Sequence, residues 1–148
     1  MTPHHRAAHR IIWAGLVLAA PFAAANLFPP AADAAAKPAT TAEILAAGDP
    51  ARGAAAYDAR CGGCHSLDAS RIGPMHRGVY GRKAGSVADF DYSPALRASG
   101  VVWEAASLDR WLSGPEAFIP GQRMGFSVSD PSVRADIIAY LKQESERD

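Results

Sequence analysis

The chain contains two cysteines, and both stand in the run Cys61-Gly62-Gly63-Cys64-His65. Two thiols at this spacing suit a disulfide, thioredoxin-type redox chemistry or the attachment of a c-type haem. The adjacent histidine favours the haem. Two intervening residues let both sulfurs reach the vinyl groups of one porphyrin, and an imidazole directly after the second cysteine is carried beneath the iron.

The residues around this run also argue against thiol chemistry. A thioredoxin-type motif would end a strand and open a helix within a βαβ unit, whereas the preceding residues have a helical pattern and no strand–helix alternation follows. A porphyrin would supply the large flat core that a helical domain with 8% aromatic residues needs. We therefore predict one covalent haem c, with its iron, on Cys61, Cys64 and His65.

Helix signals lie on both sides of the haem motif. Asp49-Pro50 places an acidic N-cap before a proline at the first helical position, which predicts a helix to about Arg60 whose end delivers the motif. Asp130-Pro131 repeats the signal and predicts a C-terminal helix to about Glu144. Shorter helices are predicted at 93–100 and 104–113, and loops at 71–91 and 118–128.

The two long helices are expected to cross. Gly53 and Tyr57 share one face of the first helix, and glycine allows a second helix backbone to come close. No segment has a convincing strand pattern. The predicted fold class is all-α, with crossing N- and C-terminal helices and with short helices and long loops around the covalent haem.

Residues 1–34 have the parts of a secretory signal: a basic start, an apolar run from Ile11 and small residues before a cleavage site after Ala34. The alternative is an uncleaved membrane anchor, although the apolar stretch 11–28 is short for a span and contains Pro21. Cleavage would leave the protein in the periplasm, and retention would anchor it to the outer face of the cytoplasmic membrane.

Residues 35–47, rich in Ala, Thr and Pro, are predicted to be a flexible tether, and residues 48–148 the folded domain. The whole chain has 15 basic and 15 acidic residues, and loss of residues 1–34 removes two arginines and one aspartate, which leaves a formal charge of −1. This balance gives no reason to expect nucleic acid as a partner. A membrane is expected only if the N-terminal segment is retained, and we expect a monomer.

Seven separated blocks, in this order, resemble class I cytochromes c of the mitochondrial and bacterial periplasmic kind. The blocks are Cys61–His65, Gly73-Pro74, Gly78–Gly85, Phe90–Ser93, Gly100–Trp103, Ile119–Met124 and Ile137–Lys142. The resemblance covers about 48–144. It implies the class I cytochrome c fold and one-electron transfer on the haem, without catalysis by this chain itself.

The resemblance also implies the ligands of the iron. Met124, in a Pro-Gly-Gln-Arg-Met setting, matches the distal ligand, and a soft, neutral thioether raises the potential of the iron. The carbonyl of Pro74 is expected to accept a hydrogen bond from the ring of His65. Met75 and His76 are weaker alternatives as ligands, because Met75 lies on the loop expected to cover the proximal side and His76 is expected in a loop or at the surface.

Further residues match positions around the haem. Arg82, Tyr92 and Trp103 match residues that hold a buried propionate, and a buried carboxylate needs such donors. Trp111 stands where the family usually has a tyrosine near the methionine sulfur.

Lysines that ring the haem edge in mitochondrial relatives are largely absent here. Glu116 and Ala117 occupy two of those positions, while Arg60 and Arg123 keep some positive charge.

Two functions suit a haem with both axial positions filled. One is an electron carrier that meets a membrane oxidase, reductase or dehydrogenase complex. The other is the haem c subunit of a periplasmic oxidoreductase complex whose catalytic centre is on another chain. A peroxidase or gas-binding haem protein would need an open iron position, which Met124 is expected to fill.

Overall fold

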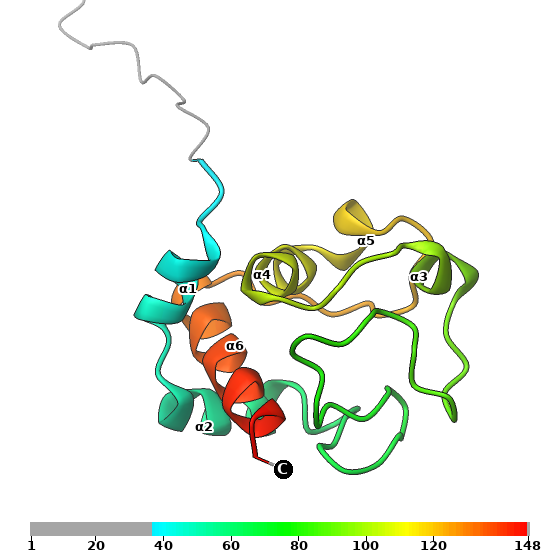
Figure 1. The fold of residues 1–148 in the computed structure, drawn as a ribbon, viewed down its shortest axis with the longest axis horizontal. Helices are drawn as coiled ribbons and strands as arrows, with labels where there is room; N and C mark the ends of the chain where they lie inside the picture. The colour runs from blue at the N-terminus through cyan, green and yellow to red at the C-terminus, as the bar shows by residue number, and fades with distance from the viewer. Residues whose placement is uncertain (1–36, 148) are drawn as a thin grey trace, which may run out of the picture. The chain divides into compact units, whose positions relative to one another are not determined.

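The computed structural model describes residues 37–147, which form six helices (Figure 1). The helices are α1 (Thr41–Ala47), α2 (Pro50–Arg60), α3 (Pro94–Ala98), α4 (Ala105–Ser113), α5 (Pro115–Phe118) and α6 (Pro131–Ser145), with the longest loops between α2 and α3 and between α5 and α6. Within 37–147 the β structure is limited to one isolated antiparallel bridge between Lys83 and Val102, so the all-α prediction is confirmed. None of the described helices is long and apolar enough to cross a membrane. The predicted signal segment, 1–34, lies outside the described residues.

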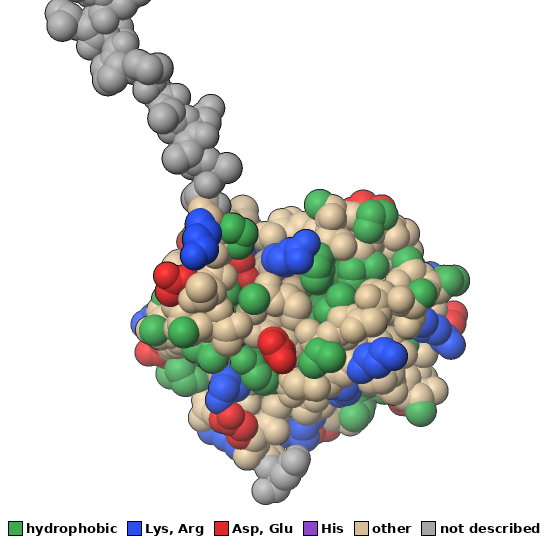
Figure 2. All heavy atoms as spheres, turned by 45° about the horizontal axis from the view of Figure 1, so that its top comes forward, with side chains coloured by type: hydrophobic (Ala, Val, Ile, Leu, Met, Phe, Trp, Pro, Cys, Tyr) green, Lys and Arg blue, Asp and Glu red, His purple; other side chains and the backbone are tan. Residues whose placement is uncertain are grey.

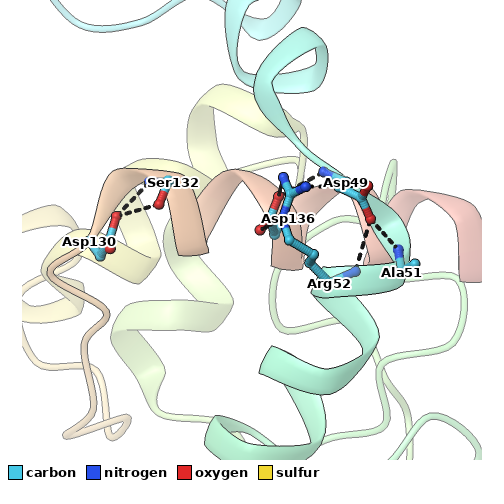
Figure 3. Close-up of polar contacts among 6 residues, drawn as sticks. All are labelled: Asp49, Ala51, Arg52, Asp130, Ser132 and Asp136. Atoms are coloured by element: carbon cyan, nitrogen blue, oxygen red, sulfur yellow. Dashed lines mark hydrogen bonds and ion pairs between the residues drawn. The ribbon is translucent and has the colours of Figure 1, made fainter.

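The predicted helix starts are present, and side chains cap them. The carboxylate of Asp49 accepts the N–H groups of Ala51 and Arg52 at 2.8 and 2.9 Å, and that of Asp130 accepts Ser132 N–H at 2.8 Å (Figure 3). These bonds satisfy donors that have no partner within the helix. The short helix α5 was not predicted, because Pro115 resumes a helical turn immediately after α4 ends.

The predicted crossing of the first and last long helices, α2 and α6, is also present. Gly53 is buried against the main chain of Asp136, and a Cβ at Gly53 would lie 2.0 Å from the Asp136 carbonyl oxygen. Beside this contact the Asp136 carboxylate accepts Asp49 N–H at 2.7 Å and two Arg52 N–H groups at 2.8 Å (Figure 3). These bonds join residues more than 80 positions apart in the chain.

The predicted flexible tether at 35–47 is wrong from Thr41 onward, because these residues form α1. Thr40 and Glu43 make a capping box, in which each side chain bonds the other residue's backbone N–H. Ile44 is buried, and α1 packs against α4 and α6. The capping signal and the apolar side chain outweigh the loop-like composition of the segment.

The core is built on the apolar faces of α4 and α6. Its most deeply buried large side chains include Ile137 and Ile138 of α6, and α4 adds Leu108, Trp111 and Leu112. The residues between α2 and α3, 61–93, contain no helix and leave from the C-terminal end of α2 (Figure 1). This loop carries most of the predicted site.

Candidate haem site

The cysteine motif begins where α2 ends. Cys61 caps the helix, and its N–H donates to the Tyr57 carbonyl at 2.7 Å. The chain then turns back on itself, with His65 N–H donating to the Cys61 carbonyl at 2.8 Å. Cys61 is half-buried, Cys64 is exposed, and both are free thiols. Both sulfurs are therefore available for attachment, and the disulfide alternative is wrong.

The surroundings of Cys61 do not suit a redox-active thiol. Such a thiol has a lowered pKa and commonly sits at a helix N-terminus. Burial instead raises the pKa of Cys61 to about 11, with Arg60 opposing the rise. The thiol also lies at the C-terminal end of α2, where the helix dipole is negative and disfavours a thiolate.

His65 is held by the loop that follows it. Its Nδ1 lies 2.9 Å from the Pro74 carbonyl oxygen, the hydrogen bond that the resemblance implied. A Cβ at Gly73 would lie 2.2 Å from His65 Cε1, so only glycine leaves room for this ring position. Burial lowers the pKa of His65, and the bond to Pro74 opposes that shift. With Nδ1 bonded to a carbonyl, Nε2 is the nitrogen free to bind a metal.

The ring of His76 stacks on that of His65, with centroids 4.0 Å apart and planes 19° apart. The Nδ1 atom of His76 is buried, and no described residue bonds it. Burial, together with the charges of His65 and Arg82, lowers the pKa of His76 well below its ordinary value. His76 lies in a loop as expected, but its ring packs on His65 instead of standing free at the surface. The sequence around His76 does not predict this stacking, because the contact depends on the path of the loop between the two histidines.

Arg82, Tyr92 and Trp103 come together as predicted neighbours. Arg82 donates to the carbonyls of Met75 and Arg77 at 2.7 and 2.9 Å, and its own carbonyl accepts Trp103 N–H at 2.9 Å. Tyr92 and Trp103 are buried. Burial raises the pKa of Tyr92, and the Arg82 guanidinium opposes that rise.

The charge of Arg82 has no carboxylate partner among residues 37–147. Burial lowers its pKa. A half-buried guanidinium held only by carbonyls suits an anionic group such as a haem propionate.

The remaining predicted residues lie on α4 and on the loop after α5. Trp111 is buried and packs against Trp103, with ring centroids 5.4 Å apart. Met124 is half-buried against the core, and its N–H donates to the side chain of Gln122. Met124 and Phe126 line a hollow of about 250 Å³.

Comparisons with known proteins agree on one family. The family model described as cytochrome c matches residues 50–145. A cytochrome c of Arabidopsis thaliana is 38% identical over 108 residues, which cover 70% of this chain and 96% of the relative. Cytochrome c2 of Rhodomicrobium vannielii is 40% identical over 105 residues, which cover 68% of this chain and 83% of the relative. Among solved structures, cytochrome cH from Methylobacterium extorquens has a TM-score of 0.62 and 44% identity, covering 65% of this chain and 99% of that one.

The described residues fit the cofactor of that family. Cys61 and Cys64 supply two free thiols, His65 presents Nε2, and Arg82 offers a cation without a carboxylate partner. This is the donor set that a covalently bound porphyrin with acidic propionates requires. The chain belongs to the cytochrome c family, in its class I, and is an electron-transfer protein with one covalently bound c-type haem.

Proposed function

We propose that His65 and Met124 are the axial ligands of the haem iron, and that the protein is an exported electron carrier of the periplasm. The bond between His65 Nδ1 and the Pro74 carbonyl carries this proposal. It fixes the tautomer of the imidazole, leaves Nε2 free to bind the iron and would make that nitrogen a stronger donor. When bound, the haem supplies a one-electron iron couple.

Met124 is the better of the two methionines for the second axial position. Met75 lies between Pro74, whose carbonyl bonds His65, and His76, whose ring stacks on His65. It therefore belongs to the same side of the site as His65. Met124 comes from a separate loop, after α5, and is half-buried against the core. A thioether there would fill the position opposite the imidazole and leave none for oxygen or peroxide.

Arg82, Tyr92 and Trp103 would hold and cover a propionate. The guanidinium would provide the charge, and the two buried aromatic residues would keep water away. Trp111 of α4 packs on Trp103 and would extend this water-poor environment. A water-poor shell stabilises the less charged, reduced state of the iron.

The surface favours short encounters with redox proteins over long-range attraction. Arg97 and Arg123 are both paired with Asp91, at 3.0 and 3.3 Å, so their charges are partly cancelled. Basic and acidic side chains are interspersed over the face in Figure 2. Ile72 and Phe126, which are 76% and 44% exposed, flank the segments that carry His65 and Met124 and would supply an apolar contact. Electron-transfer complexes are typically small and brief.

The exported location rests on the sequence of residues 1–34, with their basic start, apolar run and small residues before Ala35. In the periplasm a monomeric carrier would link membrane oxidase, reductase or dehydrogenase complexes, as part of a respiratory chain. Retention of the segment would anchor the same domain to the outer face of the membrane.

An absorption spectrum with a redox titration, recorded on the exported protein, tests the ligands and the carrier role together. We expect haem that resists acid–acetone extraction, a weak red-end band of methionine–iron ligation in the oxidised state and one reversible one-electron step. Haem that is extracted, or an oxidised spectrum without the methionine band, would overturn the proposal.

A further inference from the structure

The proposed ligand set leaves the His76 side chain unused, yet this ring is placed against the ligand imidazole. The two rings are nearly parallel, at 19°, with centroids 4.0 Å apart. The loop backbone holds His76 there, because its N–H donates to the Ser66 carbonyl at 3.0 Å and its carbonyl accepts Val79 N–H at 2.9 Å. A polar ring in this place is not needed to fill space, since an aliphatic side chain of similar size would do so.

A second ring supports His76 from behind. Tyr57 of α2 presents an edge-to-face contact to His76, with centroids 5.7 Å apart, and it packs in turn on Tyr140 of α6 at 5.4 Å. The stack on His65 is thus backed by the close crossing of α2 and α6.

Two buried polar atoms in this cluster have no hydrogen-bond partner among the described residues: the Tyr57 hydroxyl and His76 Nδ1. A buried polar group is costly unless it is hydrogen-bonded. Keeping an imidazole at this position therefore has a cost that an aliphatic side chain would avoid.

We propose that His76 is a positioning residue for His65: its stacked ring fixes the orientation of the ligand imidazole and stabilises the oxidised iron. This inference rests on the proposed ligation by His65. Oxidised iron carries one more positive charge than reduced iron, and its ligand imidazole shares that charge. The face of an aromatic ring is electron-rich and attracts a neighbouring positive charge. This attraction is stronger in the low-dielectric interior than in water.

The test compares reduction potentials of the haem-loaded protein. His76→Leu keeps a similar volume without the ring, and His76→Gln keeps polarity without the ring. Both should favour reduction, raising its equilibrium constant about three- to tenfold, where tenfold corresponds to about 59 mV for one electron. His76→Phe restores an aromatic face and should stay within about twofold of wild type, as should Tyr140→Phe at the outer end of the cluster.

A second readout separates positioning from plain packing. The haem-methyl NMR shifts of the oxidised protein report the orientation of the axial imidazole, and they should change in His76→Leu and His76→Gln but not in His76→Phe. Unchanged potential and shifts in either ring-less variant that binds haem would overturn the inference, even if its thermal stability fell. Wild type that releases its haem to acid–acetone would instead overturn the proposed function, and this is measured before the variants are compared.

Discussion

Gly53 of α2 lies directly on the backbone of Asp136 of α6. A methyl group at Gly53 would lie 2.0 Å from the Asp136 carbonyl oxygen and 2.8 Å from the Cβ of Tyr140. Neither atom is the end of a flexible side chain, so the two helices would have to move apart to admit it. The crossing of α2 and α6 supports the loop 61–93, which carries the haem motif. This crossing thus depends on the absence of a side chain at Gly53.

Gly53→Ala should therefore lower the free energy of unfolding by about 3 kcal/mol or more, toward the upper end of overpacking effects. Guanidinium unfolding of the haem-loaded protein, followed by far-UV circular dichroism, measures it. Gly114→Ala is the control, because its Cβ would make only an ordinary contact, 3.7 Å from Ala117 Cβ. If both variants were as stable as wild type, the close crossing would be refuted.

Asp136→Asn should lower the free energy of unfolding by about 1–2 kcal/mol at pH 7, because Asp136 loses its charge-assisted bonds to the partly exposed Arg52. The hydrogen bond from Arg52 lowers the pKa of Asp136 in the folded protein. The stabilisation is thus complete above the unfolded pKa of about 3.9 and is lost as pH falls through the lower folded value. The difference between wild type and variant should shrink from pH 5 to pH 3.

Denaturant midpoints at pH 7, 5 and 3 measure this difference. Asp91→Asn is the control, since Asp91 is exposed and pairs only with exposed arginines; its effect should stay below about 0.5 kcal/mol. A constant gap between wild type and Asp136→Asn at all three pH values would contradict the ionic role of Asp136.

Met124→Ala should remove the red-end band of the oxidised protein and lower the potential by on the order of 0.1 V, well within the range that axial ligands span. Loss of the thioether removes a ligand that favours reduced iron. Met75→Ala is the comparison, since Met75 directly follows Pro74, whose carbonyl bonds His65. If the band survives in Met124→Ala and disappears in Met75→Ala, the methionines have been assigned the wrong way round.

Electron exchange with a physiological partner should slow less than about tenfold between low and physiological salt, a modest span for electrostatic steering. The reason is that Arg97 and Arg123 are paired with Asp91. Stopped-flow rates across ionic strength measure this. Asp91→Asn frees both arginines and should steepen the dependence. A steep fall in the wild-type rate with rising ionic strength would show that other cations, such as Arg60, dominate the encounter.

The helices were predictable because their starts are encoded locally. Asp49-Pro50 and Asp130-Pro131 each combine a capping carboxylate with a proline, and both begin helices where expected. The composition of 35–47 is typical of a loop, whereas the capping-box spacing of Thr40 and Glu43 is the local signal that indicates α1.

The site was predictable only in part. The haem motif from Cys61 to His65 can be recognised from adjacent residues alone. The hydrogen bond between His65 and the Pro74 carbonyl was implied by the family resemblance. The stacking of His76 on His65 joins residues 11 positions apart through a loop without repeating structure. No periodic pattern describes such a loop, and its path is fixed by tertiary bonds, including those from Arg82 to two carbonyls.

Cleavage of the exported chain after Ala34 should leave Ala35 as its first residue. N-terminal sequencing of the periplasmic fraction measures this, and cleavage there would keep the Thr40 cap of α1 intact. Finding the segment that begins at Met1 still attached, in the membrane fraction, would establish the anchored form instead.

The crossing of α2 and α6 also bears on when this chain can fold. Its two halves come from opposite ends of the sequence, and the bonds from Arg52 to Asp136 span 84 residues. In a chain threaded N-terminus first through an export channel, α6 is the last helix to emerge, so α2 has no partner until translocation is nearly complete. In a chain exported in that order, Cys61 and Cys64 would lie at the end of a helix that has not yet packed, accessible for haem attachment. That order would let cofactor attachment precede closure of the core.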